Sequence, residues 1–114
     1  MGGELTYDKA LADRMRKVLG RQPSLTEKEM FGGIGFLIRG NMACGVHDGE
    51  MIVRVGPAAH AAALKEAHVR PFDLSGGRPA TGWVLVDAAG VSKPTDLKKW
   101  VERGVTFARS LPPK

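Results

Sequence analysis

Cys44 and His47 are the residues whose types first suggest catalysis. A cysteine thiolate activated by a histidine base is a common enzymatic nucleophile. The two lie three positions apart in a segment that alternates like a β-strand, and residues three apart on a strand point to opposite faces. The pair therefore cannot meet, and we expect Cys44 to be a small, buried and unreactive core residue. As the only cysteine, it also excludes an internal disulfide and a cysteine-based zinc site.

His47 and Glu50 would be the start of a metal site if His60 or His68 joined them. Zinc sites need three or four converging ligands. His60 and His68 are eight residues apart and have no third ligand near them in the sequence. A cross-strand ion pair between His47 and Glu50 is the better interpretation, so we predict no metal site.

Two glycine-rich segments resemble phosphate-binding loops. Residues 32–35 (Gly-Gly-Ile-Gly) lack the third glycine of the dinucleotide pattern and the Gly-Lys-Ser/Thr ending of the P-loop, and a strand follows them. A bulge or a close approach of two backbones explains these glycines better. Residues 75–78 are a weak anion nest at most, and nothing places Asp73 beside Asp87 as an acid–base pair. We therefore predict no catalytic, cofactor-binding or metal-binding residues; an enzyme or small-ligand binder that uses one of these loops is the most distant alternative.

The hydropathy pattern predicts helices and strands in the order α-β-β-β-β-α-β-α. Helical periodicity predicts helices over residues 6–19, with Thr6 as N-cap, and 94–111, and alanine-rich residues 58–67 predict another. Period-two alternation predicts five strands, over residues 26–31, 34–39, 42–47, 51–55 and 83–87. Arg70-Pro71 ends the middle helix, and residues 71–82 are expected to form a loop.

Two tight turns set the expected register of the strands. If Gly40-Asn41 and Asp48-Gly49 are two-residue turns, Leu37, Cys44 and Val53 share an apolar face that receives the helices. The other face then has an apolar centre and a polar edge. Its candidate interaction residues are Phe36, Ile38, Ile52, His47 and Arg54. We expect a protein partner of unknown identity on this open face, and a second copy of the chain, forming a homodimer, is the other occupant considered.

Length and composition are those of one ordinary globular domain. The 114 residues are 43% hydrophobic and 25% charged, which excludes a disordered or fibrous chain. No uncharged apolar stretch approaches the roughly 20 residues of a membrane span. The N-terminus lacks the basic and apolar regions of a signal peptide. We therefore predict a cytoplasmic protein with no membrane partner.

Positive charge gathers at the two ends of the chain. Lys and Arg number 17 against 12 Asp and Glu, which gives a net charge of +5, and residues 91–114 hold six basic against two acidic residues. The candidate basic surface consists of Arg14, Arg16, Lys17, Lys98, Lys99, Arg103 and Arg109. Such charges are more often a solvated helix face, and no aromatic residues interleave with them to stack bases. We expect weak, non-specific nucleic-acid binding at most.

A series of short motifs runs from about Met15 to the C-terminus. They lie at residues 30–36, 40–42, 44–46, 52–56, 69–73, 77–79, 82–84 and 100–101. With Met-Phe-Gly-Gly at 30–33 as the most specific element, this series resembles the TfoX N-terminal domain family. The resemblance implies a two-layer α+β fold with an antiparallel sheet of about five strands and helices on one face, similar to YjbR-like and secretion-chaperone-like domains.

The resemblance also implies a function. The family is named for bacterial regulators of natural competence, which act on transcription together with other factors. A C-terminal helical domain follows in those regulators, whereas here we expect one domain over residues 1–114 without it. The resemblance brings no catalytic residues. We therefore expect a non-enzymatic cytoplasmic regulatory or adaptor domain that binds a protein, with direct nucleic-acid binding through the basic helices as the alternative.

Overall fold

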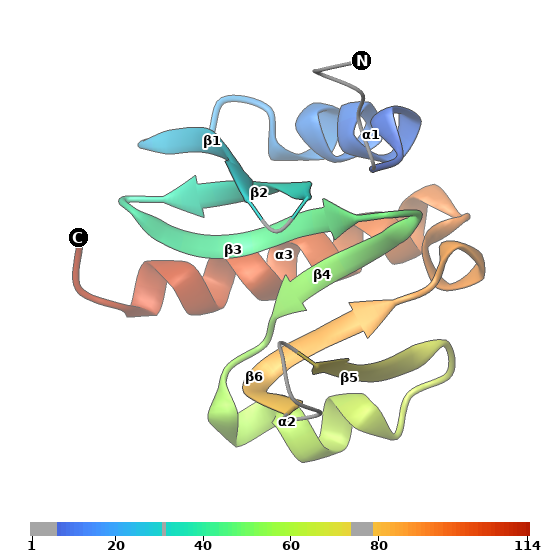
Figure 1. Cartoon of the computed structure of the whole chain (residues 1–114). Coiled ribbons are helices and arrows are strands. Elements are labelled where there is room, and N and C mark those ends of the chain that lie inside the picture. Colours follow the sequence, from blue (N-terminus) through green and yellow to red (C-terminus); the bar gives the residue numbers. More distant parts are fainter. Residues whose placement is uncertain (1–6, 31, 74–78) are drawn as a thin grey trace.

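The computed structural model describes residues 7–30, 32–73 and 79–114 (Figure 1). Its helices are α1 (Lys9–Leu19), α2 (Pro57–Leu64), the short 3₁₀ helix η1 (Ala88–Val91) and α3 (Pro94–Ser110). Its strands are β1 (Leu25–Met30), β2 (Gly33–Ile38), β3 (Asn41–His47), β4 (Glu50–Arg54), β5 (Val69–Asp73) and β6 (Pro79–Val86).

The strands form one antiparallel sheet in the order β1-β2-β3-β4-β6-β5. Helix α3 crosses behind β3 and β4, and α1 packs against α3 and β3 (Figure 1). Ala63 of α2 joins the same core as α1 and α3. The helices therefore share one face of the sheet, which confirms the predicted two-layer α+β fold.

The sheet has six strands among the described residues, one more than predicted, because β5 lies where a helix end and a loop were expected. The sequence predicts that Arg70-Pro71 ends the middle helix, but Pro71 lies within β5. Strand β5 pairs only with β6 and forms an edge of the sheet, and a proline is tolerated on an edge strand because its missing N–H can face outward. Strand β6 begins at Pro79, four residues before the predicted start.

Helix α1 begins later than predicted. Its N-cap is Asp8, whose side chain accepts a hydrogen bond from the Leu11 amide at 3.1 Å. The expected cap, Thr6, lies outside the described residues. A carboxylate at this position satisfies an amide that the first helical turn leaves unpaired, so Asp8 fixes the start of α1.

The main core lies between the sheet and the helices. Leu11 and Met15 of α1 and Trp100 of α3 belong to this cluster. Trp100 lies on the apolar stripe that helical periodicity predicts for residues 94–111, and it is 3% exposed. Gly104 sets how closely α3 approaches the sheet. A Cβ atom there would lie 2.3 Å from the carbonyl oxygen of Ala43 on β3, so the contact requires glycine.

The hairpin between β3 and β4 has the predicted register. Val46 pairs with Met51, Cys44 with Val53, and His47 with Glu50 around the Asp48-Gly49 turn. Asp48 has a φ of 53°, a left-handed conformation that aspartate tolerates and that this type of turn needs. The short-range signal was therefore sufficient here.

The predicted register of the preceding hairpin is wrong, because its turn lies one residue earlier in the chain than expected. The turn residues are Arg39 and Gly40, with φ values of 52° and 83°, so Ile38 pairs with Asn41. The register then shifts between Phe36 and Leu37, where β3 carries an extra residue. This bulge and the displaced turn put Phe36 and Ile38 on the helix-covered face.

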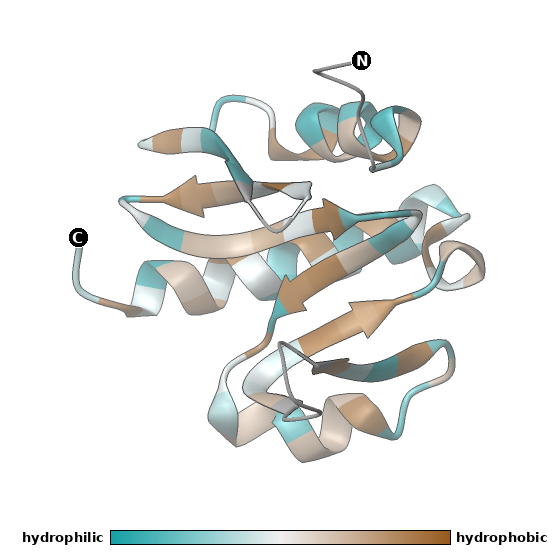
Figure 2. Ribbon diagram, in the orientation of Figure 1, coloured by the Kyte–Doolittle hydropathy of each residue, from teal (hydrophilic) through white to brown (hydrophobic). Residues whose placement is uncertain are grey.

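Hydropathy along β4 and β6 explains why apolar residues occur on both faces of the sheet. Both strands are brown through the centre of the sheet in Figure 2, because each contains a run of consecutive apolar residues. Successive strand residues point to opposite faces. Val53 and Val84 therefore face the helices, whereas Ile52 and Leu85 belong to a second cluster on the face that no described helix covers.

Candidate functional site

The predicted interaction residues are divided between the two faces of the sheet. Phe36 and Ile38 are fully buried beneath the helices and cannot contact a partner. The prediction that they lie on the open face is wrong, because it depended on the incorrect turn. Ile52 is on the open face, and His47 and Arg54 lie at its margins.

The open face is packed more fully than the sequence indicated. Ile52, Met42, Phe72 and Leu85 form a cluster in which each residue is 2–7% exposed. At its margins, His47 lies against Phe72 with ring centres 6.4 Å apart. The apolar centre of this face is thus largely removed from contact, and the partly exposed members against it are Leu37 and Trp83.

The N-terminal part of the predicted basic surface is used inside the molecule. The side chain of Arg14, on α1, donates a hydrogen bond to the carbonyl oxygen of Val91, in η1, at 2.8 Å. Arg16 pairs with Glu27 at 2.8 Å and with Asp13 at 2.5 Å. The hydrogen bonds that Arg16 donates to Glu27 raise the pKa of Arg16 above its ordinary value. These two arginines tie α1 to other elements.

Most basic residues of α3 are also partnered. Arg103 pairs with Glu66 at 2.9 Å, and Lys99 approaches the same carboxylate at 3.8 Å. Arg109 donates to Gln22 at 2.5 Å. Within the part of the chain that the structure describes, Lys17 and Lys98 are the predicted basic residues that have no such partner. The structure therefore does not assemble the seven residues into one free cationic surface.

Cys44 and His47 lie on opposite faces, as predicted. Cys44 is fully buried in the main core, and burial raises the pKa of its thiol to about 12. His47 is on the other side of the sheet, against Phe72. A buried thiol with this pKa carries almost no thiolate at neutral pH, so it is a poor nucleophile.

The remaining candidate ligands are dispersed. Over residues 7–30, 32–73 and 79–114, no three His, Cys, Asp or Glu side chains gather in a way that could hold a metal ion. His68 pairs with Asp87 at 3.1 Å. Gly33 lies against the backbone of β3, where a Cβ would be 2.0 Å from the Val46 oxygen, which is the close approach expected of it. Residues 75–78, considered as a weak anion nest at most, lie outside the described part.

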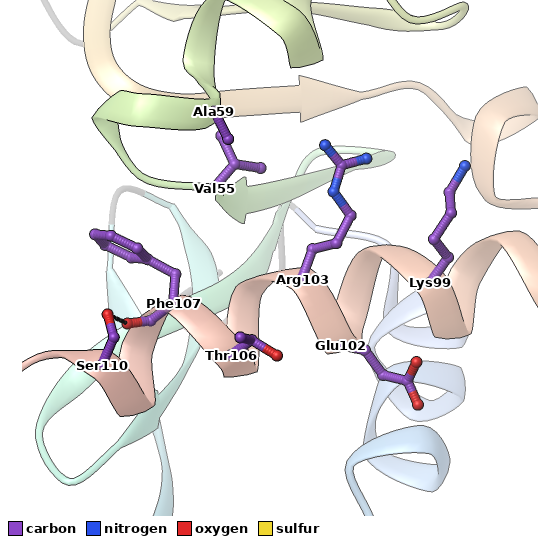
Figure 3. Close-up of a pocket in the computed structure, with 8 residues that line it drawn as sticks. All are labelled: Val55, Ala59, Lys99, Glu102, Arg103, Thr106, Phe107 and Ser110. Carbon is purple, nitrogen blue, oxygen red and sulfur yellow. Dashed lines mark hydrogen bonds between the residues drawn. The ribbon is translucent and has the colours of Figure 1, made fainter.

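A groove with a volume of about 480 Å³ lies between α2 and α3 (Figure 3). One wall is formed by Val55 and Ala59, at the start of α2. Helix α3 forms the floor, with Phe107, Arg103 and Lys99 directed toward α2 in Figure 3. The other lining residues are Glu102, Thr106 and Ser110. An apolar surface thus lies between charged and hydroxyl side chains.

Gly56 explains why Phe107 lies at the edge of this groove. It has a φ of 90°, and a Cβ atom there would be 2.4 Å from the Phe107 ring. The ring therefore rests directly on the backbone where β4 leads into α2. Only glycine combines this conformation with so close a contact.

Arg54 lies beside the groove and has no counter-charge among the described residues. Its guanidinium carbon is 4.9 Å from the centre of the Trp83 ring and 5.4 Å from that of Phe107. No ion pair or hydrogen bond joins its side chain to another described residue. Partial burial lowers the pKa of Arg54 from its ordinary value. Two aromatic faces hold the cation in place, and its five N–H donors remain available.

A second hollow of about 290 Å³ lies near the other end of α3. It is lined by more polar residues, including Glu66, His68 and Asp96. Its charges are largely paired already, since Glu66 forms an ion pair with Arg103 and His68 pairs with Asp87. It therefore offers less unmatched chemistry than the groove beside Phe107.

Phe107 was missed from the sequence, although a signal was present. The apolar stripe predicted for the last helix passes through Trp100, Gly104 and Ala108, and Phe107 falls outside it. Residues 99, 103 and 107 are spaced by four and form a second ridge. An aromatic residue off the core stripe of an amphipathic helix indicates a second contact, here with the start of α2.

Comparison with protein families gives a match over most of the chain. The model of the TfoX N-terminal domain matches residues 17–108. No curated protein and no solved structure matches significantly. No helix in the described residues has the length and apolar character required to cross a membrane. The motifs at 30–36 and 52–56, the α+β fold and this match agree: the chain belongs to the TfoX N-terminal domain family.

Proposed function

We propose that this chain is a non-enzymatic regulatory or adaptor domain that binds a protein partner in the groove between α2 and α3. The observation that supports this most is the juxtaposition of the apolar Phe107 wall with the unpaired Arg54 guanidinium. Protein interfaces commonly combine an aromatic or arginine anchor with a polar rim. The groove replaces the open sheet face as the preferred surface, because the apolar cluster on that face is packed against itself.

The partner that we favour is a component of transcription in a bacterial cytoplasm. Membership of the TfoX N-terminal domain family supports this choice, because the resemblance implies a relationship to regulators of natural competence that act with other factors. Such a role needs a surface for another protein and requires no reaction. The buried, proton-retaining thiol of Cys44 is in keeping with a binding domain.

Two other modes of binding remain as alternatives. Direct nucleic-acid binding is favoured by the net charge of +5, but the internal pairing of Arg14, Arg16, Arg103 and Arg109 leaves little of that charge in one place. A homodimer through the open sheet face would use the half-buried Leu37 and Trp83. Both predict contacts away from the groove.

Site-specific photo-crosslinking separates these modes. A photoreactive amino acid replaces Thr106, an exposed lining residue of the groove, or Thr26, an exposed residue of β1 and thus a matched control. We expect a discrete protein adduct from position 106 in cells and none from position 26. The captured protein is then purified, and its binding to the isolated chain is measured with Phe107→Ala. An adduct to a second copy or to nucleic acid, or binding that is indifferent to Phe107→Ala, contradicts the proposal.

A further inference from the structure

Resting on the proposed function, we infer that the groove binds a short acidic segment of the partner protein. In this arrangement an apolar side chain of the segment lies against Phe107, and an adjacent carboxylate pairs with Arg54. The inference depends on the position of one unmatched cation relative to one apolar wall. It names the chemistry of the partner rather than its identity.

Arg54 is suited to bind a carboxylate. A guanidinium presents a planar fork that matches the two oxygens of a carboxylate. Its guanidinium carbon lies over the Trp83 and Phe107 rings, 4.9 and 5.4 Å from their centres. No acidic side chain that the structure describes pairs with its N–H groups, which leaves these donors for a ligand. An anionic group therefore finds an oriented donor whose position is already fixed.

Phe107 joins this cation to the groove. The same ring that contacts Arg54 also lines the groove with Val55 and Ala59. A segment that binds both must carry an apolar side chain and a carboxylate within one or two residues of each other. This spacing favours a peptide over an isolated anion, because an anion alone leaves the apolar wall uncovered.

The end of the groove farther from Arg54 also carries a net positive charge. Arg103 and Lys99 share the single carboxylate of Glu66, so one positive charge is left over. Glu102 lines the groove too, and Figure 3 shows its carboxylate directed away from Arg103 and Phe107. Charge complementarity at both ends therefore selects an acidic segment over a basic one.

The length of the groove sets the length of the segment. The lining residues of α3 run from Lys99 to Ser110, which at 1.5 Å per residue is roughly 16 Å. An extended chain of about five residues spans this distance at about 3.3 Å per residue. The volume of about 480 Å³ is within the range of about 300–1,000 Å³ that is typical of ligand sites.

A random peptide library displayed on phage provides the test, with the folded full chain as bait. We expect selected peptides to share an apolar residue next to Asp or Glu. The affinity of one such peptide is then measured for the parent, for Arg54→Gln and for Lys98→Gln, an exposed cation on α3 outside the groove. Arg54→Gln should weaken binding by about tenfold or more, whereas Lys98→Gln should change it less than twofold or so.

Replacing the acidic residue of the peptide by its amide gives a second, independent measurement on the parent chain. It should reproduce the loss, and it should add little further loss in Arg54→Gln. This measurement decides the matter even if Arg54→Gln unfolds. Selection of no peptide, selection without acidic residues, or equal effects of Arg54→Gln and Lys98→Gln would overturn the inference. If the adduct at position 106 persists in those cases, the proposed function stands and only the acidic segment is wrong; if the adduct is absent, the proposed function fails by itself.

Discussion

The two faces of the sheet are built from the same strands but have different partners. On the covered face, Phe36 and Val53 pack against α1 and α3 in a large continuous core. On the open face, Ile52, Leu85 and two neighbours form a small cluster without any described helix above it. Neighbouring residues of one strand therefore contribute unequally to stability. The groove that we propose as the binding site lies between two helices at the margin of the core, where the core residue Val55 lines it.

Replacing Phe36 and Leu37 separately by alanine tests this comparison most strongly. Phe36 is fully buried among the helices, so Phe36→Ala should lower the free energy of unfolding by about 3–5 kcal/mol. Leu37 is half-buried on the open face, and Leu37→Ala should cost about 1 kcal/mol. Urea denaturation followed by tryptophan fluorescence measures both. Equal losses would mean that the strand register is incorrect.

Gly104→Ala tests the contact between α3 and the covered face. Helix propensity alone would make this variant more stable by about 1 kcal/mol. The added methyl group would collide with the backbone of Ala43, and overpacking of this kind costs about 1–3 kcal/mol. We expect net destabilisation in thermal unfolding, with the exposed Ser110→Ala as a control that changes little. A more stable Gly104→Ala would show that α3 can move away from β3.

The pH dependence of stability tests whether Cys44 is buried on the covered face. Because burial raises its pKa to about 12, the folded chain keeps the thiol proton at pH values where an unfolded chain, with a thiol pKa of about 8.5, has lost it. The free energy of unfolding should therefore fall as pH rises from about 9 toward 12. Cys44→Ala should cost about 1 kcal/mol at neutral pH and show a shallower fall.

Labelling of Cys44 by a thiol reagent gives a direct check on the same site. The native chain should react only as fast as it unfolds, because the thiol is fully buried. Rapid labelling under native conditions would be incompatible with this position in the core.

Arg16→Gln examines the charged rim of the covered face, where the expected effect is small. The side chains of Arg16 and Glu27 are 36% and 38% exposed, so solvent screens their attraction. We expect a loss of at most about 1 kcal/mol that diminishes with added salt. Lys17→Gln, on the same helix but with no ion pair among the described residues, should have no measurable effect. A salt-independent loss would assign Arg16 a packing role.

Nucleic-acid binding should be the weakest effect. Lys17 and Lys98 supply few phosphate contacts, so we expect dissociation constants of about 10⁻⁴–10⁻⁶ M at physiological salt, without preference among duplexes. Fluorescence anisotropy across a salt titration measures this. Nanomolar binding that discriminates between random and promoter duplexes would favour the nucleic-acid alternative over the groove.

Features that depend on one short segment of the chain were predicted correctly from the sequence. The Asp48-Gly49 hairpin has its predicted register because the turn residues themselves define it. The amphipathic stripe that contains Trp100 placed that residue correctly in the core. The motif series also identified the family correctly. These features depend on neighbours in the chain, which the sequence lists directly.

The face occupied by Phe36 depended on more than local signals. Arg39 takes a left-handed conformation that arginine seldom adopts, and β3 contains a bulge that leaves no mark in the sequence. The apolar series Ile34, Phe36 and Ile38 competes with Gly35 and Leu37 for the core, and burial of the larger apolar surface decides the register. That preference is expressed only when the helices are present to receive those side chains.

The sequence by itself determined the class of fold, the helices with their buried stripes, the second hairpin and the inert Cys44. Tertiary structure alone decided which cations remain unpaired. Arg16 and Arg103 meet acidic residues 11 and 37 positions away in the chain, and Arg54 meets Trp83 and Phe107 but no acid among the described residues. Charge at a position can be read from its residue type, whereas neutralisation depends on distance in space, which is fixed only when the sheet and helices pack together.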